Sequence, residues 1–278
     1  MSFGVFLAVL FAAALHAGWN AVVRLGSDRV QGVIMMSASQ GVIGLAMVLY
    51  FPMPNPAAWP WLIASGIVHT AYKLFLAAAY SHGDLSRVYP IARGAAPVMV
   101  ALFSAAFLTE AVGLGDYAGI ALVALGIMLM ARGVFSGGEA RALLPFALGS
   151  AVCTAGYSIL DGLGARIAET ASGFTGWLFL IDAILITICG YIWKGRAIMP
   201  RDLALWRAGA IAGTMSLGAY WIVIWAMTVA PIALVTALRE TSVLFATAIG
   251  IIWLGEPSTR GKIIAAALIL AGIIVIRL

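Results

Sequence analysis

Charge is what this sequence most conspicuously lacks. Only 10% of its 278 residues are Asp, Glu, Lys or Arg, whereas 63% are hydrophobic. Soluble domains carry about 25% charged residues, so this composition excludes a soluble globular surface. In a bilayer the same apolar side chains form a suitable outer surface. The composition therefore predicts an integral membrane protein surrounded by membrane lipid.

Cysteines and catalytic motifs are also scarce. The two cysteines, Cys153 and Cys189, lie inside apolar runs without CxxC spacing, which indicates packing rather than a metal or redox site. The chain has no HExxH, GxSxG or DxxD pattern and no Walker phosphate loop, so we expect no enzyme, catalytic residue, metal or cofactor. Its net charge of +5 is not gathered in a basic stripe, and no nucleic-acid partner is expected.

Long apolar runs are abundant instead. Turn-forming or charged residues separate ten of them, each about 20 residues long, the length that a helix needs to cross the hydrocarbon core. We expect spans at 3–24, 32–51, 59–80, 86–108, 116–134, 143–161, 173–193, 206–228, 232–254 and 261–277. The predicted fold class is an all-α polytopic membrane protein with ten transmembrane helices in one membrane domain.

The two halves of the chain resemble each other. Polar residues coincide at a shift of 146 residues, which pairs Arg93 with Arg239, Glu110 with Glu256, and Gly115 with Gly261. A shift of 138 residues also brings segment 16–20 onto 154–158. We therefore predict two five-helix repeats, 1–137 and 138–278. A unit with an odd number of spans inserts its second copy upside down, so the repeats are expected to be inverted, as in many secondary transporters.

One pattern within each half carries a family resemblance. It consists of a short turn before a fourth span, which contains proline in the first half, then Glu and, a few residues later, a Gly that opens the fifth span. The pattern runs from Ala79 through Pro90 to Glu110 and Gly115, and recurs from Ala226 to Glu256 and Gly261. It resembles the EamA-type drug/metabolite transporters over nearly the whole chain. The resemblance implies a ten-span fold that moves a solute, without naming the substrate, and we expect it in the bacterial inner (plasma) membrane.

The basic residues near or beyond the ends of the spans predict the orientation. Eleven of the 13 follow odd-numbered spans: Arg24, Arg29, Arg87, Arg132, Arg141, Lys194, Arg196, Arg201, Arg207, Arg260 and Lys262. Only Arg166 and Arg277 lie on the other face. Because basic loops stay in the cytoplasm, both termini are predicted to lie outside.

Three cations lie deep inside predicted spans, away from the span ends: Lys73, Arg93 and Arg239. Charge in the hydrocarbon is costly, so such residues face the bundle interior and find a partner. One interpretation is a positive midplane cavity that receives a carboxylate or a similar anionic group, with guanidinium groups suited to bidentate contact. The other is that structural pairs with Asp161, Asp182 or Glu240 neutralise the two arginines. Arg239 and Glu240 need not pair with each other, since neighbours on a helix point about 100° apart.

Further polar and aromatic residues of the spans complete the predicted site. The candidates for substrate contact are Tyr89, Trp19, Asn20, Tyr157, Tyr220 and Trp221, and those for proton coupling are His16, Asp161 and Glu240. The group around His16 either lines a cavity or bridges helices, since polar packing residues are common in membranes. His69 is either a proton carrier or a hydrogen-bonded structural residue. Glu110 and Glu256 are expected to make terminal hydrogen bonds.

These features together predict a secondary transporter that works by alternating access around a midplane cavity. We expect an exporter of a small polar metabolite with a carboxylate or other anionic group, such as an amino acid, that functions as a monomer. The two prolines of the fourth span are expected to bend it near the site. A membrane channel is the main alternative, and an intramembrane enzyme is disfavoured by the missing motifs.

Overall fold

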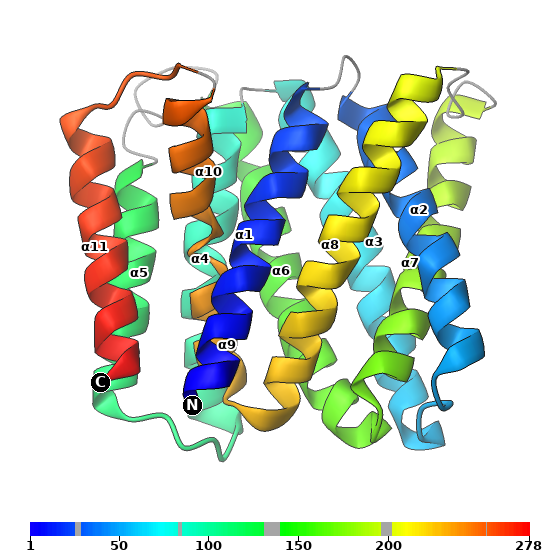
Figure 1. The fold of residues 1–278 in the computed structure, drawn as a ribbon, viewed down its shortest axis with the longest axis horizontal. Helices are drawn as coiled ribbons and strands as arrows, with labels where there is room; N and C mark the ends of the chain where they lie inside the picture. Colours follow the sequence, from blue (N-terminus) through cyan, green and yellow to red (C-terminus); the bar gives the residue numbers. More distant parts are fainter. Residues whose placement is uncertain (26–28, 83–84, 131–139, 196–201, 254) are drawn as a thin grey trace.

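The computed structural model describes residues 1–25, 29–82, 85–130, 140–195, 202–253 and 255–278. Within these ranges the chain is helical and contains no strand (Figure 1). The helices are α1 (Phe3–Leu25), α2 (Arg29–Tyr50), the short 3-10 helix η1 (Pro56–Ala58), α3 (Trp59–His82), α4 (Leu85–Phe107), α5 (Leu114–Met130), α6 (Ala140–Ala168), α7 (Ala171–Lys194), α8 (Leu203–Val229), α9 (Ile232–Arg239), α10 (Ser242–Ile252) and α11 (Arg260–Arg277).

Length and hydropathy of the helices identify an integral membrane protein. Six described segments are long and apolar enough to cross a bilayer, and two shorter apolar helices lie at Arg93–Phe107 and Leu114–Met130. Large apolar side chains also cover the outside, including Leu49, Ile192 and Leu114, which are 79–89% exposed. Such an exterior is unfavourable in water and suits lipid. The prediction of an all-helical membrane protein is confirmed.

A helix occupies each of the ten predicted ranges, with one change in the ninth. There the chain forms two helices, α9 and α10, which meet at Glu240 and Thr241 near mid-height of the bundle (Figure 1). The backbone stays hydrogen-bonded across the junction through tight bonds such as Thr241 N–H to the carbonyl of Leu238, at 3.0 Å. A short tight turn inside a helix often marks a functional hinge. The prolines of α4, by contrast, leave that helix uninterrupted from Leu85 to Phe107.

Polar side chains cap the N-termini of several helices. Thr170 caps α7 by accepting from the amide of Gly173 at 3.0 Å, and Asp202 caps α8 by accepting from Ala204 at 2.8 Å. Such caps satisfy amides that have no partner within the helix.

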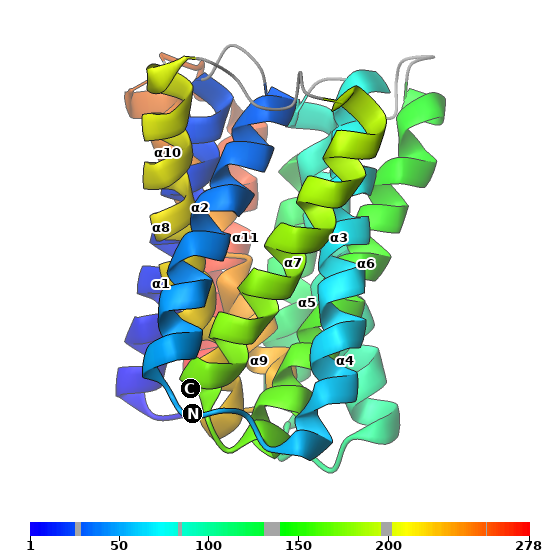
Figure 2. The same ribbon diagram turned by 90° about the vertical axis from the view of Figure 1, so that its right-hand side faces the viewer.

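Both termini lie at one end of the bundle, here called the terminus end (Figures 1 and 2). The same end carries the connections 51–58, 108–113, 169–170 and 230–231.

The helix pairs repeat when the two halves are exchanged. Helix α3 packs along α6 as α8 packs along α1, and α4 packs along α6 as α10 packs along α1. The pairs α2–α7 and α5–α11 each join two corresponding helices. Helices α1 and α6 run in opposite directions along the bundle (Figure 1). The same set of helix contacts therefore occurs in both halves.

In the α5–α11 pair, the contacts of single residues repeat as well. A Cβ atom on Gly119 would lie 2.8 Å from the carbonyl oxygen of Gly272, and one on Gly126 would lie 2.8 Å from that of Ala265. The 146-residue shift converts the first contact into the second. Gly119 and, in α8, Gly213 lie against neighbouring backbone, as expected for small residues at helix interfaces, whereas Gly115 has open space.

Candidate functional site

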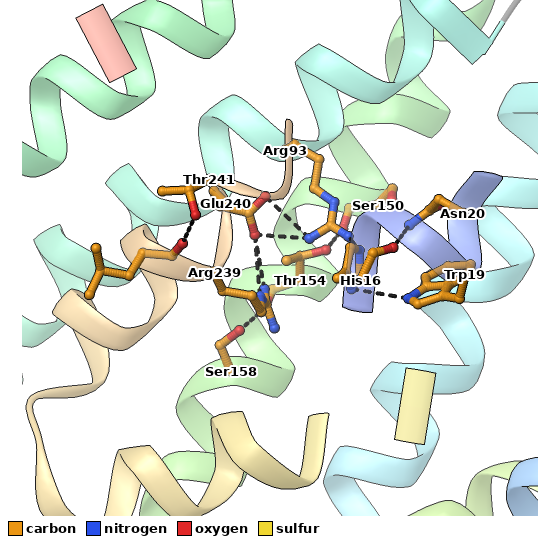
Figure 3. A network of polar contacts seen from close by, with 11 residues as sticks. His16, Trp19, Asn20, Arg93, Ser150, Thr154, Ser158, Arg239, Glu240 and Thr241 are labelled. Carbon is orange, nitrogen blue, oxygen red and sulfur yellow. Dashed lines mark hydrogen bonds and ion pairs between the residues drawn. The ribbon is translucent and has the colours of Figure 1, made fainter. Parts of the chain in front are cut away.

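A buried ionic network joins the two halves near the α9–α10 junction (Figure 3). Arg93 of α4 donates from Nη1 to both carboxylate oxygens of Glu240, at 2.9 and 3.2 Å. Arg239 donates to the same carboxylate from Nη2 at 3.1 Å. Each of the three side chains is at most 3% exposed. One carboxylate thus holds two guanidinium groups, one from each half of the chain.

The Glu240 geometry explains how sequence neighbours pair. A regular helix would direct residues 239 and 240 about 100° apart. Here α9 ends at Arg239, and Glu240 belongs to the tight turn before α10. The turn brings the Glu240 carboxylate to Arg239 as well as across the bundle to Arg93. Of the two interpretations made from sequence, the structural pairing is observed for Glu240 alone, because Asp161 and Asp182 have other partners.

His16 of α1 borders the network on the side away from Arg239 (Figure 3). Its Nε2 contacts Nη2 of Arg93, while its Nδ1 faces the indole N–H of Trp19 at 3.2 Å. Asn20 donates to the His16 carbonyl at 2.8 Å. A neutral imidazole accepts at one nitrogen only. The ring therefore accepts from one of these two donors at a time, and the network is richer in donors than in acceptors.

A second cluster, centred on Asp161, adjoins Arg239. Asp161 accepts from Ser65 and from the hydroxyl of Tyr220, and its Oδ2 lies 3.0 Å from His69 Nε2. His69 also stacks on the ring of Tyr157, at 4.0 Å between centroids. The Arg239 guanidinium lies over both tyrosine rings, 5.6 and 5.7 Å from their centroids. Such cation–π contacts strengthen when the ring and the cation are removed from water.

Hydroxyl groups of α6 follow the network along one helix face. Ser150, Thr154 and Ser158 are spaced by four residues and lie beside the arginines (Figure 3). Thr154 and Ser158 donate to backbone carbonyls one turn earlier in their own helix. The buried hydroxyls of Ser150, Thr236 and Ser242 have no hydrogen-bond partner. Buried polar groups are normally paired, so these hydroxyls are unfilled hydrogen-bonding capacity inside the bundle.

Lys73 forms a separate cluster between α2, α3 and α7. Its ammonium pairs with Asp182 and donates to Ser37 at 2.7 Å and to Gln40 at 3.5 Å. Lys73 is 7% exposed and Asp182 is 1% exposed. The pair balances its own charge inside the bundle. We interpret it as a structural tie between three helices.

A further ionic contact lies at the terminus end. Glu110, which follows α4, accepts from the first amide of α9, that of Ile232, with both oxygens at 3.1 Å. Arg166 of α6 donates to Glu110 at 2.6 Å and also to the carbonyls of Met227 and Ala230. A carboxylate at a helix N-terminus is favoured by the helix dipole. The expected terminal hydrogen bonding of Glu110 is confirmed, and it links the two halves.

The structure gathers most of the residues predicted for the site. Nine lie in the arginine network or the adjoining Asp161 cluster: Arg93, Arg239, His16, Trp19, Asn20, Tyr157, Tyr220, Asp161 and Glu240. Lys73 lies outside both. Trp221 is directed to Ser172, to which its indole donates at 3.0 Å, and to Phe51. The side chain of Tyr89 lies outside the described part of the structure.

The prediction missed the hydroxyls that complete these clusters. Ser65 lies one helical turn before His69, and the two share the Asp161 carboxylate. The i, i+4 spacing of two polar residues in an apolar span is the signal that could have identified this pair. Ser150 and Thr154 of α6 show the same i, i+4 spacing. Among the described residues, no group of three or more His, Cys, Asp or Glu side chains could hold a metal ion.

The network is rich in buried hydrogen-bond donors. Two guanidinium groups offer planar sets of N–H donors that match a carboxylate, and one of their charges is not balanced by Glu240. Aromatic rings from α6 and α8 and hydroxyls from α6 border the same region.

Comparison with known proteins identifies the family. A crystal structure of a protein superposes on this chain with a TM-score of 0.81 at 18% sequence identity, over 99% of this chain and 98% of the other, which shows a shared fold. No curated protein matches. The model of the EamA-like transporter family matches residues 2–132 and 142–278. The resemblance seen in the sequence is thus confirmed, and the chain belongs to the EamA-like transporter family.

Proposed function

We propose that the protein is a secondary transporter of a small metabolite that carries a carboxylate or similar anionic group, such as an amino acid. The observation that carries the proposal is the buried Glu240 carboxylate held by Arg93 and Arg239. Burying two guanidinium groups against one carboxylate is costly, and a solute anion that compensates the second charge offsets this cost. The site also contains residues of both halves. In a rocking carrier, movement of one half against the other opens such a site to one side of the membrane and then to the other.

The proposed transport unit consists of ten spans in two inverted repeats, 1–137 and 138–278. The exchange symmetry of the helix pairs supports this assignment, as do the two symmetry-related contacts between α5 and α11. The unit is proposed to work as a monomer. Alternating access then follows from tilting of the halves about the network, which lies near mid-height of the bundle.

The proposed direction of net movement is export across the bacterial inner membrane, with the terminus end outside. The Lys and Arg bias of the sequence supports this orientation, since eleven of the 13 basic residues near or beyond the span ends are predicted on the opposite face. His16, Asp161 and Glu240 are the candidates for coupling to protons, because they are titratable groups within or next to the network.

A thermal-shift series tests the requirement for a carboxylate. Purified protein in detergent is titrated with L-phenylalanine, L-serine and L-glutamate, and in parallel with phenethylamine, ethanolamine and L-phenylalaninamide. At least one amino acid is expected to raise the melting temperature saturably, while its analogue without a free carboxylate does not. Equal stabilisation by an amino acid and by its amine or amide would argue against an anion site.

The Glu110 contact predicts which end of the structure is closed. Replacing Glu110 with Gln removes the charge that links Arg166 to the α9 N-terminus, and hydrogen bonds to charged groups contribute about 1.5–3 kcal/mol. We expect the terminus end to open at least about tenfold more often in Glu110→Gln. The reporter is a cysteine at Ser158, which lies two turns before Arg166 on α6, in a chain without Cys153 and Cys189.

Labelling of that cysteine by a membrane-impermeant anionic methanethiosulfonate from the terminus side is expected to accelerate accordingly. Glu256→Gln is the matched control, because Glu256 corresponds to Glu110 but pairs with Lys262 of its own half at 3.0 Å. Unchanged labelling in Glu110→Gln, or equal acceleration in both variants, would show that Glu110 does not hold this end closed.

A further inference from the structure

Glu240 has no counterpart in the other half of the molecule. The shift that pairs Arg93 with Arg239 places Gly94 at the position of Glu240. The repeated unit therefore supplies two arginines, and only the second copy adds a carboxylate. A structural need for charge neutralisation would be met equally well by one acid for each arginine. The asymmetry suggests that one acid serves both.

The carboxylate occupies the place where a ligand's carboxylate would be expected. Both of its oxygens accept from Nη1 of Arg93, and Oε1 also accepts from Arg239. Two guanidinium groups that converge on one carboxylate form the kind of donor set that recognises a free carboxylate. In this structure the anion is part of the chain itself.

One unpartnered hydroxyl borders the network, and two more belong to the segment that carries Glu240. Thr236 lies one helical turn before Glu240, Ser242 lies two residues after it, and Ser150 faces the network from α6 (Figure 3). All three hydroxyls are fully buried and lack a hydrogen-bond partner. Leaving such groups unpaired costs free energy, which an incoming polar ligand would recover.

We infer that Glu240 is an internal stand-in for the solute's carboxylate: it holds both arginines while the site is empty and yields one of them when a free carboxylate binds. This inference rests on the proposed function. In the empty site one carboxylate is shared by two guanidinium groups, and in the loaded site each guanidinium has its own carboxylate. Glu240 lies in the turn between α9 and α10, outside either regular helix, so its side chain can change partner without unwinding a helix.

The stand-in has a consequence for transport. Two uncompensated guanidinium groups in an empty site would raise the free energy of an occluded, water-free intermediate, and so would slow the return of the empty carrier. With Glu240 in place one of the two charges is compensated and both guanidinium groups are hydrogen-bonded, so the empty carrier can return without solute. Net movement of solute then becomes possible, whereas a carrier without the stand-in would be restricted to exchange.

Chemical rescue by acetate tests the inference without knowledge of the natural solute. Glu240→Gly reproduces what the first half carries at Gly94 and leaves room for a free anion. We expect this variant to melt at a lower temperature than the unaltered protein and to recover saturably when sodium acetate is added. Sodium chloride at the same ionic strength is expected not to restore it. The apparent acetate affinity should exceed that of the unaltered protein by about tenfold or more.

Two further variants keep the test decisive. Thr241→Gly introduces the same backbone freedom at the neighbouring position but retains Glu240, so acetate should stabilise it no more than the unaltered protein. If Glu240→Gly does not fold, Glu240→Gln replaces it, since it keeps the volume and loses the charge. Greater acetate stabilisation of Glu240→Gln than of the unaltered protein supports the inference, and equal stabilisation overturns it.

The same series separates the inference from the proposed function. Acetate rescue reports on the receptor formed by Arg93 and Arg239 and requires no transport. Absence of acetate-specific stabilisation in a folded Glu240 variant would overturn the stand-in, even if the unaltered protein moves amino acids. Failure of the unaltered protein to move any carboxylate solute would overturn the proposed function, whatever acetate does to the variants.

Discussion

Replacing Arg93 with glutamine is expected to abolish transport of a carboxylate solute while the protein remains folded. The variant retains Arg239 beside Glu240, so one cation still balances one anion and no buried charge is left alone. It loses the second guanidinium, which the solute needs. The loss of a charged, bidentate contact of about 3 kcal/mol or more lowers kcat/KM by at least about a hundredfold. Arg239→Gln should behave alike, since Arg93 then keeps Glu240.

Purified variants in proteoliposomes provide the measurement, with gel filtration and melting temperature as evidence of folding. Arg93→Lys is informative as well, because an ammonium keeps the charge but cannot make the planar, bidentate contact, and only partial activity is expected. Arg277→Gln is the matched control, since Arg277 lies over the ring of Phe3 near the C-terminus. Normal transport by both Arg93→Gln and Arg239→Gln would eliminate the anion site.

Replacing Lys73 with methionine is expected to cause the largest loss of stability. The substitution keeps the side-chain volume but leaves Asp182, 1% exposed, without its ionic partner. Removing one member of a buried ion pair typically costs about 3–5 kcal/mol, more than losing the pair as a whole. The melting temperature in detergent should therefore fall steeply in Lys73→Met and in Asp182→Asn.

The double variant Lys73→Met, Asp182→Leu distinguishes a structural pair from a solute contact. With both charges gone, we expect most of the stability to return, and transport with it. A double variant that is stable but inactive would mean that Lys73 contacts the solute, which is the role that the sequence also allowed. The hydrogen bonds of Lys73 to Ser37 and Gln40 favour the structural role.

The fold was predictable because a bilayer imposes simple demands on sequence. A span needs about 20 apolar residues, and every break between spans in this chain carries turn-forming or charged residues. Arg93 and Arg239 were predictable as a pair because charge is rare in such a chain, so two arginines at equivalent positions stand out against the apolar background. Both arginines contact one carboxylate, that of Glu240.

The partner of the arginines was harder to predict. Helical periodicity separates Arg239 and Glu240 by about 100°, and no glycine or proline lies between Thr236 and Ser242 to indicate the tight turn that brings them together. The prolines of the fourth span drew attention to α4, which is a continuous helix, whereas α9 and α10 are separated without any proline between them. Hydroxyls such as Ser65 and Ser150 were missed for a different reason: serine satisfies itself on its own helix so often that its presence in a span carries little information.

Counterflow in proteoliposomes tests the central claim most directly, that a site for a carboxylate opens alternately to the two sides of the membrane. Vesicles are loaded with an unlabelled amino acid that stabilises the protein in the thermal-shift series, and uptake of the radiolabelled compound is followed. We predict saturable uptake that is accelerated by the internal solute, is absent in Arg93→Gln, and does not occur with the amide of the same amino acid. Uptake that rises linearly with concentration and ignores the internal solute would contradict a carrier and indicate a channel.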